Sequence, residues 1–145
     1  MKINETEFRD RVVFVTGAAN GIGAAMAEAF AERGATVILT DRSDSVREAA
    51  QKLGHQHQAH VLDVCDEAAI DAVVGAVEAS CGRIDVLVNN AGIGVLGPAE
   101  SLATDIWDRH MDVNLKGAFL VARRIAGGML ERGYGRVINI ASQAA

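Results

Sequence analysis

Long apolar segments and an excess of basic residues are both missing from this sequence of 145 residues. A membrane-spanning helix needs about 20 consecutive apolar residues, and no run here approaches that length. Lysine and arginine total 14 against 19 aspartates and glutamates, which gives a formal net charge of −5. Without a basic stripe to neutralise phosphates, nucleic acid is excluded as a partner. The polar, acidic segment 1–8 is unlike a secretory signal, so we expect no membrane partner and a cytoplasmic location.

Cysteine is scarce as well. Cys65 and Cys81 are 16 residues apart, at the two ends of one predicted helix. At 1.5 Å of rise per residue this separation is roughly 24 Å, which is too wide for a disulfide. We therefore expect two reduced thiols, as in a cytosol.

The four histidines do not predict a metal site. His57 and His60 have opposite parity on a strand and point to opposite faces of it, and no tetrahedral ligand spacing extends from them to Cys65. We expect them, with His55, to be exposed on a loop and a sheet edge. His110 is interpreted as a lone helical histidine without a ligand role.

What the sequence does contain is a glycine-rich turn between an apolar run, residues 12–16, and a helical pattern that starts at 24. Gly17 permits a tight turn, Gly21 lets backbone N–H groups approach an anion, and Gly23 lets the helix lie close to the strand. The helix N-terminus then offers unpaired N–H donors and a partial positive charge to a pyrophosphate. Because glycine turns are common in α/β proteins, this turn alone is a weak signal.

A second unit strengthens the signal. Residues 36–41 form a predicted strand that ends in Asp41, 24 residues after Gly17. A carboxylate at this position can accept hydrogen bonds from an adenosine ribose and repel a 2′-phosphate. The alternative is a surface aspartate at a strand end, beside Arg42. In combination with the glycine turn, the spacing favours nucleotide binding, with NAD preferred to NADP.

The rest of the chain alternates strands and helices without a linker, which predicts one domain over 1–145 with a parallel sheet and right-handed crossovers. The stripe Ile70, Val73, Val74 and Val77 is typical of a helix that faces a sheet. Glycine follows each predicted helix, where a left-handed residue is favoured, at 34, 54, 82 and 133. The predicted strands are 12–16, 36–41, 57–63, 85–89 and 136–141, and the predicted helices are 22–33, 43–53, 66–81 and about 104–132.

Two motifs carry a resemblance to a known family. The glycine turn reads Thr-Gly-x-x-x-Gly-x-Gly over residues 16–23, and Asn-Asn-Ala-Gly follows at 89–92. With these motifs the whole chain resembles, in order, the short-chain dehydrogenase/reductase family. The resemblance implies an α/β fold with a Rossmann-like, doubly wound parallel sheet in strand order 3-2-1-4-5, truncated after the fifth strand. It also implies nicotinamide-dependent oxidation of alcohols or reduction of ketones and other carbonyls.

The resemblance further implies roles for individual residues. Asn114 matches the family's catalytic asparagine and Ser142 its catalytic serine, although a solvent-facing asparagine and a small polar residue near the C-terminus are the alternatives. Apolar residues at 111, 113, 115, 119 and 120 favour burial of Asn114, and a buried amide must be hydrogen-bonded. The expected cofactor is NAD, and the expected cofactor-binding residues are Thr16, Gly17, Asn20, Gly21, Ile22, Gly23, Asp41, Arg42, Asp63, Val64, Asn90, Ala91 and Gly92.

The family's Tyr-x-x-x-Lys pair has no match here. It is expected about a dozen residues after the serine, where only residues 143–145 follow, and Tyr134 has Val137 three residues on and Ile138 four residues on. Two functions therefore stay open: an NAD-dependent oxidoreductase whose remaining half is supplied elsewhere, and a catalytically inactive NAD-binding fragment or module. We also expect association, as a homo-oligomer or with a C-terminal half, because the fifth strand would be an apolar sheet edge.

Overall fold

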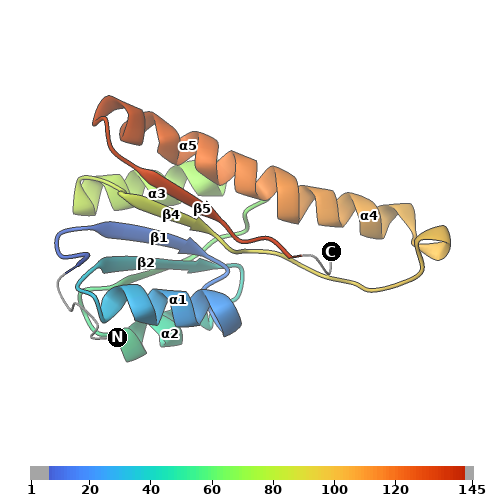
Figure 1. Ribbon diagram of the computed structural model, residues 1–145, viewed down its shortest axis with the longest axis horizontal. Coiled ribbons are helices and arrows are strands. Elements are labelled where there is room, and N and C mark those ends of the chain that lie inside the picture. The colour runs from blue at the N-terminus through green and yellow to red at the C-terminus, as the bar shows by residue number, and fades with distance from the viewer. Residues whose placement is uncertain (1–6, 143–145) are drawn as a thin grey trace.

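Five parallel strands form the centre of the computed structural model, which describes residues 7–142. Their order across the sheet is β3-β2-β1-β4-β5, so the predicted order is confirmed and the direction of winding reverses between β1 and β4 (Figure 1). The carboxyl ends of β1 and β4 therefore meet at the switch point where ligands bind in folds of this class. The strands are β1 (Val12–Thr16), β2 (Thr36–Asp41), β3 (Gln58–Val61), β4 (Val86–Asn89) and β5 (Arg136–Asn139).

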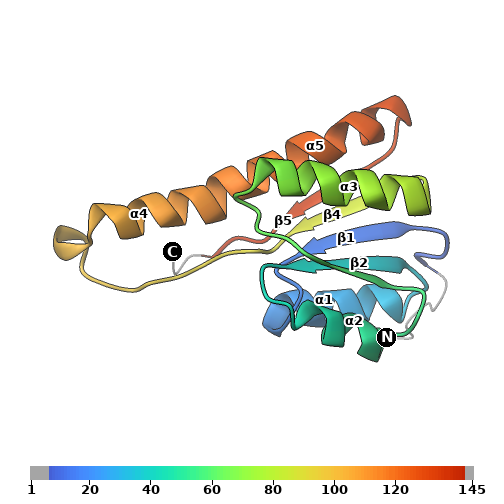
Figure 2. The ribbon, with the colours of Figure 1, turned by 180° about the vertical axis from the view of Figure 1, so that it is seen from behind.

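Helices cover both faces of the sheet, as Figures 1 and 2 show. On one face α1 (Gly21–Ala31) and α2 (Val46–Leu53) pack against Val13 and Val15 of β1. On the other face α3 (Glu67–Cys81) and α5 (Ala118–Glu131) pack against Phe14. Every residue of β1 and β4 is buried, as expected for central strands of a parallel sheet that is covered on both sides.

The predicted helix 104–132 is continuous, but it is not α-helical throughout. It begins as α4 (Thr104–His110), widens into a π-helical segment, η2 (Met111–Gly117), and returns to the α form in α5. A Cβ on Gly117 would lie 2.6 Å from Val64 Cγ2, so glycine is what allows the helix to approach the loop after β3. Helix α4 extends beyond the sheet and is joined to β4 by a long connection (Figure 1) that contains a short 3₁₀ turn, η1 (Ala99–Ser101).

Other predictions from the sequence are confirmed in detail. Gly34, Gly54, Gly82 and Gly133 all have positive φ angles just after helices, as expected. The stripe of α3 faces the sheet, with Ile70, Val74 and Val77 buried and Val73 partly buried. Within residues 7–142, no helix is long and apolar enough to cross a membrane.

The prediction that His57 is exposed is wrong. Its side chain is 8% exposed, and its Nδ1 accepts a hydrogen bond of 3.1 Å from the backbone N–H of Val37. Strand β3 begins at Gln58, one residue later than predicted, and the imidazole of His57 binds the N–H of Val37 just before the first β2–β3 pair, Ile38 and Gln58. Burial lowers the pKa of His57, which keeps this ring neutral.

Strand β5 lies at the edge of the sheet, as predicted, although it ends at Asn139 rather than at 141. Its apolar side chains are partly open to solvent: Val137 is 43% exposed and Ile138 is 40% exposed. The association that we expect from this edge stays a prediction.

Candidate functional site

The loop between β1 and α1 lies at the carboxyl edge of the sheet and owes its shape to its glycines. Gly17 has a φ of +65°, and a Cβ there would lie 2.8 Å from the Cα of Ala91. A Cβ on Gly23 would lie 2.1 Å from the carbonyl oxygen of Gly17, so the helix can approach the loop only because this residue lacks a side chain. Gly21, with a φ of +57°, has nothing within 4 Å of the position of a Cβ. The loop is therefore packed on one side and open on the other.

The first turn of α1 faces this loop. The first backbone bond of the helix runs from the N–H of Ala24 to the carbonyl of Asn20, at 3.2 Å, and Asn20 makes no side-chain cap within the described chain. The N–H groups of Gly21, Ile22 and Gly23 precede that bond and have no partner in the helix. Together with the helix dipole, they make this end of α1 favourable for an anion.

Thr16 and Asn90 join the ends of β1 and β4 beneath the loop. The Thr16 hydroxyl is buried and accepts hydrogen bonds from the N–H groups of Asn90 and Ala91, both at 3.0 Å. The side-chain amide of Asn90 donates to the carbonyls of Thr16 and Gly17, at 3.1 and 3.0 Å. These two side chains hold the loop from below, and direct contact of either with a cofactor stays a prediction.

Asp41 is tied to the same loop from the end of β2. Its Oδ2 accepts from the N–H of Ala19 at 3.1 Å, and its Oδ1 accepts from the N–H of Ser43 at 2.9 Å. The half-buried carboxylate is thereby held at a fixed place beside the glycine turn. Asp41 and the glycine turn therefore lie side by side, and their contact with a cofactor stays a prediction.

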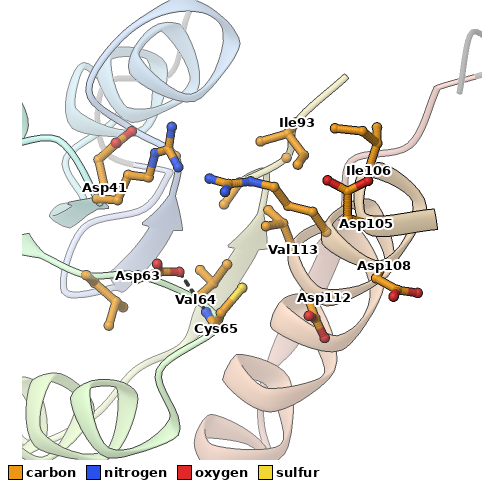
Figure 3. Close-up of a pocket in the computed structure, with 16 residues that line it drawn as sticks. Asp41, Asp63, Val64, Cys65, Ile93, Asp105, Ile106, Asp108, Asp112 and Val113 are labelled. Atoms are coloured by element: carbon orange, nitrogen blue, oxygen red, sulfur yellow. Dashed lines mark hydrogen bonds between the residues drawn. The ribbon is translucent and has the colours of Figure 1, made fainter. Parts of the chain in front are cut away.

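A cavity of about 660 Å³ opens at this edge of the sheet. It is lined by seven of the residues predicted to bind cofactor, namely Gly17, Asp41, Arg42, Asp63, Val64, Ala91 and Gly92. In Figure 3, Asp41 lies on one side of the cavity, and Asp105 and Ile106 of α4 lie on the other. The structure therefore gathers segments that are separated by up to 96 residues, from Gly17 to Val113, around one space.

The long helix supplies a wall of this cavity that was not predicted from the sequence. Asp105, Arg109 and Val113 lie four residues apart, and the same face adds Ile106, Asp108 and Asp112. This spacing of three to four residues is the signal that would have identified one helix face. Leu62, Cys65 and Ile93 complete the lining.

The polar lining of the cavity is predominantly acidic. Aspartates at 41, 63, 105, 108 and 112 outnumber the two arginines, Arg42 and Arg109. Asp63 is held by the N–H of Cys65, at 2.9 Å from its Oδ1 (Figure 3). Burial and then the charge of Asp63 raise the pKa of the Cys65 thiol, so this thiol stays protonated at neutral pH. Within residues 7–142, no three side chains of His, Cys, Asp or Glu are grouped to hold a metal ion.

The expected burial of Asn114 is wrong, whereas its expected hydrogen bonding is confirmed. Asn114 is exposed, whereas Gly117 of the same π-helical segment η2 is buried. Its Oδ1 accepts from the N–H of Ile93 at 2.8 Å, and its Nδ2 donates to the carbonyl of Ile93 at 2.9 Å. The amide is therefore satisfied by the main chain of the segment after β4 rather than by a core. Ser142 lies three residues after β5 and is exposed.

Tyr134 lies at the opposite end of the strands from the cavity, just before β5 begins. Its ring is stacked under the guanidinium groups of Arg11 and Arg136, at 4.3 and 5.2 Å from the ring centroid. Arg11 precedes β1 and Arg136 begins β5, so this cluster lies at the amino ends of the strands. Tyr134 is consequently placed away from the cavity.

Comparison with known proteins agrees with this geometry. The family profile described as "short chain dehydrogenase" matches residues 11–145. The D-threitol dehydrogenase of Mycolicibacterium smegmatis is 46% identical over 139 residues, which are 93% of this chain and 54% of that protein. The NAD-dependent glycerol dehydrogenase of Listeria innocua is 42% identical over 136 residues, which are 93% of this chain and 54% of that protein.

A solved structure, described as NAD⁺-bound xylitol dehydrogenase, superposes with a TM-score of 0.91 at 34% identity. The match covers 95% of this chain and 55% of that one. The chain spans about half the length of the relatives that it matches.

Proposed function

This chain belongs to the short-chain dehydrogenase/reductase family, and from that premise we propose that it forms the NAD-binding half of an oxidoreductase that acts on small polyols. The observation that carries the proposal is that Gly17 of the glycine loop and the held carboxylate of Asp41 line one cavity, with the first turn of α1 following directly on that loop. Phosphate and ribose need different groups: the first turn of α1 offers N–H donors for phosphate, and Asp41 offers an acceptor for ribose hydroxyls.

The cofactor would be held by groups that line the cavity and by the glycine loop beside it. The open side of Gly21 and the free N–H groups of α1 would bind the pyrophosphate, with Asn20 and Ile22 beside them. Asp41 and Arg42 would face the adenosine ribose, Asp63 and Val64 the adenine, and the backbone of Ala91 and Gly92 would lie alongside. When bound, the nicotinamide ring supplies the acceptor or donor of a hydride.

The residues of this chain would then position the reacting groups. Asn114 holds the main chain at Ile93 and so keeps one wall of the cavity in place. By family resemblance, Ser142 would orient the substrate oxygen. Proton transfer would fall to the family's tyrosine, with a lysine that lowers its pKa. Tyr134 does not fit that role, because its ring contacts the guanidinium groups of Arg11 and Arg136 at the amino ends of the strands, away from the cavity.

The position of Tyr134 also supports a second candidate function. A chain that presents a cofactor cavity without a tyrosine beside it would act as a nicotinamide-binding module that another polypeptide segment completes. The mass of the natural gene product separates the two candidates: a longer product that contains Tyr-x-x-x-Lys supports the enzyme, and a product of 145 residues supports the module.

The preference for NAD over NADP rests on the charge of Asp41. Its carboxylate would repel a 2′-phosphate, and Ala18, Ala19 and Asn20 of the loop carry no basic group to offset it. Arg42 opposes this effect from the neighbouring position in the same cavity. A repulsion of this kind is worth ~1–3 kcal/mol, or about ten- to a hundredfold in affinity.

The choice of polyols as substrates rests on the relatives. The names of three of them specify D-threitol, glycerol and xylitol as substrates. These molecules share vicinal hydroxyl groups on a short carbon chain, and the protein that contains this chain is expected to oxidise that class.

Calorimetric titration with NAD⁺ and NADP⁺ tests the cofactor assignment. We expect wild type to bind NAD⁺ about ten- to a hundredfold more tightly, and Asp41→Asn to narrow this ratio because it removes the charge with little change in shape. Asp44→Asn is the matched control, since Asp44 is an exposed carboxylate three residues away that pairs with Arg47 and does not line the cavity. Equal affinities in wild type, or an equal effect of both variants, would remove Asp41 from this role.

A further inference from the structure

The segment after β4 has no strand partner along the cavity, yet two of its backbone N–H groups are hydrogen-bonded to side chains of the long helix. The N–H of Ile93 donates to Asn114 Oδ1 at 2.8 Å, and the N–H of Val95 donates to His110 Nε2 at 3.0 Å. Asn114 belongs to the expected site, whereas the sequence assigned no role to His110.

The spacing of these two bonds explains why they form together. His110 ends α4 and Asn114 lies four residues later in the π-helical segment η2, so the two side chains are about one helical turn apart. Ile93 and Val95 are two residues apart, so the N–H of Val95 meets His110 while the N–H of Ile93 meets Asn114. The long helix thus presents two hydrogen-bond acceptors, Asn114 Oδ1 and His110 Nε2, to the segment 93–95.

The hydrogen bonds of His110 also define its protonation state. Its Nδ1 lies 2.7 Å from the carbonyl oxygen of Ile106, and a carbonyl can only accept. Nδ1 must therefore carry the proton, which leaves the lone pair of Nε2 free to accept from Val95. A neutral ring with its proton on Nδ1 satisfies both contacts at once.

We propose that His110 is a positioning residue that fixes the segment 93–95 against the long helix and thereby holds the wall of the cofactor cavity formed by Gly92 and Ile93. Ile93 lines the cavity and is hydrogen-bonded to Asn114. The bond from Val95 to His110 attaches the same segment to the helix at a second point. An apolar side chain at position 110 could not accept the hydrogen bond from the N–H of Val95, because the contact needs an acceptor at the distance of Nε2. The consequence for cofactor affinity rests on the proposed function, whereas the structural role does not.

The test compares His110→Leu, which removes the acceptor, with His110→Gln, whose amide oxygen reaches about as far from Cα as Nε2. His55→Leu is the matched control, because His55 is exposed on the loop before β3, at the edge of the sheet opposite the cavity. Amide hydrogen exchange at Val95 and calorimetric affinity for NAD⁺ are measured in all four proteins. The ¹⁵N spectrum of the wild-type imidazole reports the tautomer of His110.

We expect exchange at Val95 to be about three- to tenfold faster in His110→Leu, as for the loss of one hydrogen bond, and to be restored in His110→Gln. We expect NAD⁺ to bind about three- to tenfold more weakly to the leucine variant, and His55→Leu to match wild type in both measurements. A wild-type ring with its proton on Nε2 would overturn the proposal, as would unchanged exchange in His110→Leu or no rescue by glutamine.

The two proposals fail in different ways. If wild type binds no NAD⁺, the proposed function fails, and exchange at Val95 together with the imidazole tautomer still decides whether His110 holds the segment. If NAD⁺ binds wild type and His110→Leu equally although Val95 is released, the positioning role for the cofactor fails and the proposed function stands.

Discussion

Adding one methyl group at Gly23 tests how the glycine loop is built. A Cβ there would lie 2.1 Å from the Gly17 carbonyl oxygen and 2.5 Å from Asn90 Nδ2, about 1 Å inside normal contact. The Gly17 carbonyl belongs to the backbone, so the helix or the loop must move. Overpacking of this kind costs about 3 kcal/mol, and the better helix propensity of alanine returns about 1 kcal/mol. We expect Gly23→Ala to lose about 2 kcal/mol of stability.

Two other glycines provide the controls. Gly127 is inside α5 with nothing within 4 Å of a Cβ, so Gly127→Ala is expected to gain up to about 1 kcal/mol from helix propensity. Gly21 is equally open but has a φ of +57°, so Gly21→Ala is expected to lose about 1 kcal/mol to backbone strain. Its methyl group would also stand on the open side of the loop, where we propose that the pyrophosphate binds.

Urea denaturation followed by far-UV circular dichroism measures the three stabilities, and calorimetry measures binding of NAD⁺. We expect Gly23→Ala and Gly21→Ala both to weaken NAD⁺ binding at least tenfold and Gly127→Ala to leave it unchanged. A Gly23→Ala protein as stable as Gly127→Ala, or one that binds NAD⁺ like wild type, would refute the packing argument.

Three further predictions concern pH, activity and association. Burial lowers the pKa of His57 and His60 in the folded state. As the pH falls below about 6.5, these histidines are therefore protonated in the unfolded state before they are protonated in the folded state. The free energy of unfolding should therefore fall from about pH 7 to pH 5.5, and less steeply in His57→Asn; equal slopes in urea denaturation would contradict this. With Tyr134 far from the cavity, the 145-residue chain alone should give no NADH absorbance above background with any polyol, and turnover would refute this expectation. The exposed Val137 and Ile138 of β5 should make the chain associate, and a single species with the mass of one chain in dilute light scattering would argue against it.

The shape of the glycine loop could be predicted because it depends on local sequence, whereas the order of the strands was implied only by the family resemblance. A β-branched run followed by Gly17, Gly21 and Gly23 requires a strand, a tight turn and a closely packed helix, and the structure has all three. Asp41 could be placed beside the loop because the carboxyl ends of adjacent parallel strands meet at one edge of the sheet.

The rest depended on contacts between segments far apart in the sequence. Asn114 reads as buried from its apolar neighbours, but it is exposed in the π-helical segment η2, and its amide is hydrogen-bonded to the main chain of Ile93. The sequence predicts His57 in a strand at an exposed sheet edge, yet its ring is buried and accepts a hydrogen bond from the N–H of Val37. Arg109 lines the cavity only because the long helix extends past the end of the sheet.

The central claim is that nicotinamide cofactor binds at the carboxyl edge of the sheet through the glycine loop. Titration of NAD⁺ into ¹⁵N-labelled protein, followed through the backbone amide resonances, tests this claim most directly. We expect the largest shifts at residues 17–23, with further shifts at Asp41, Val64 and Gly92. An absence of shifts, or shifts confined to the Tyr134 edge of the sheet, would contradict it.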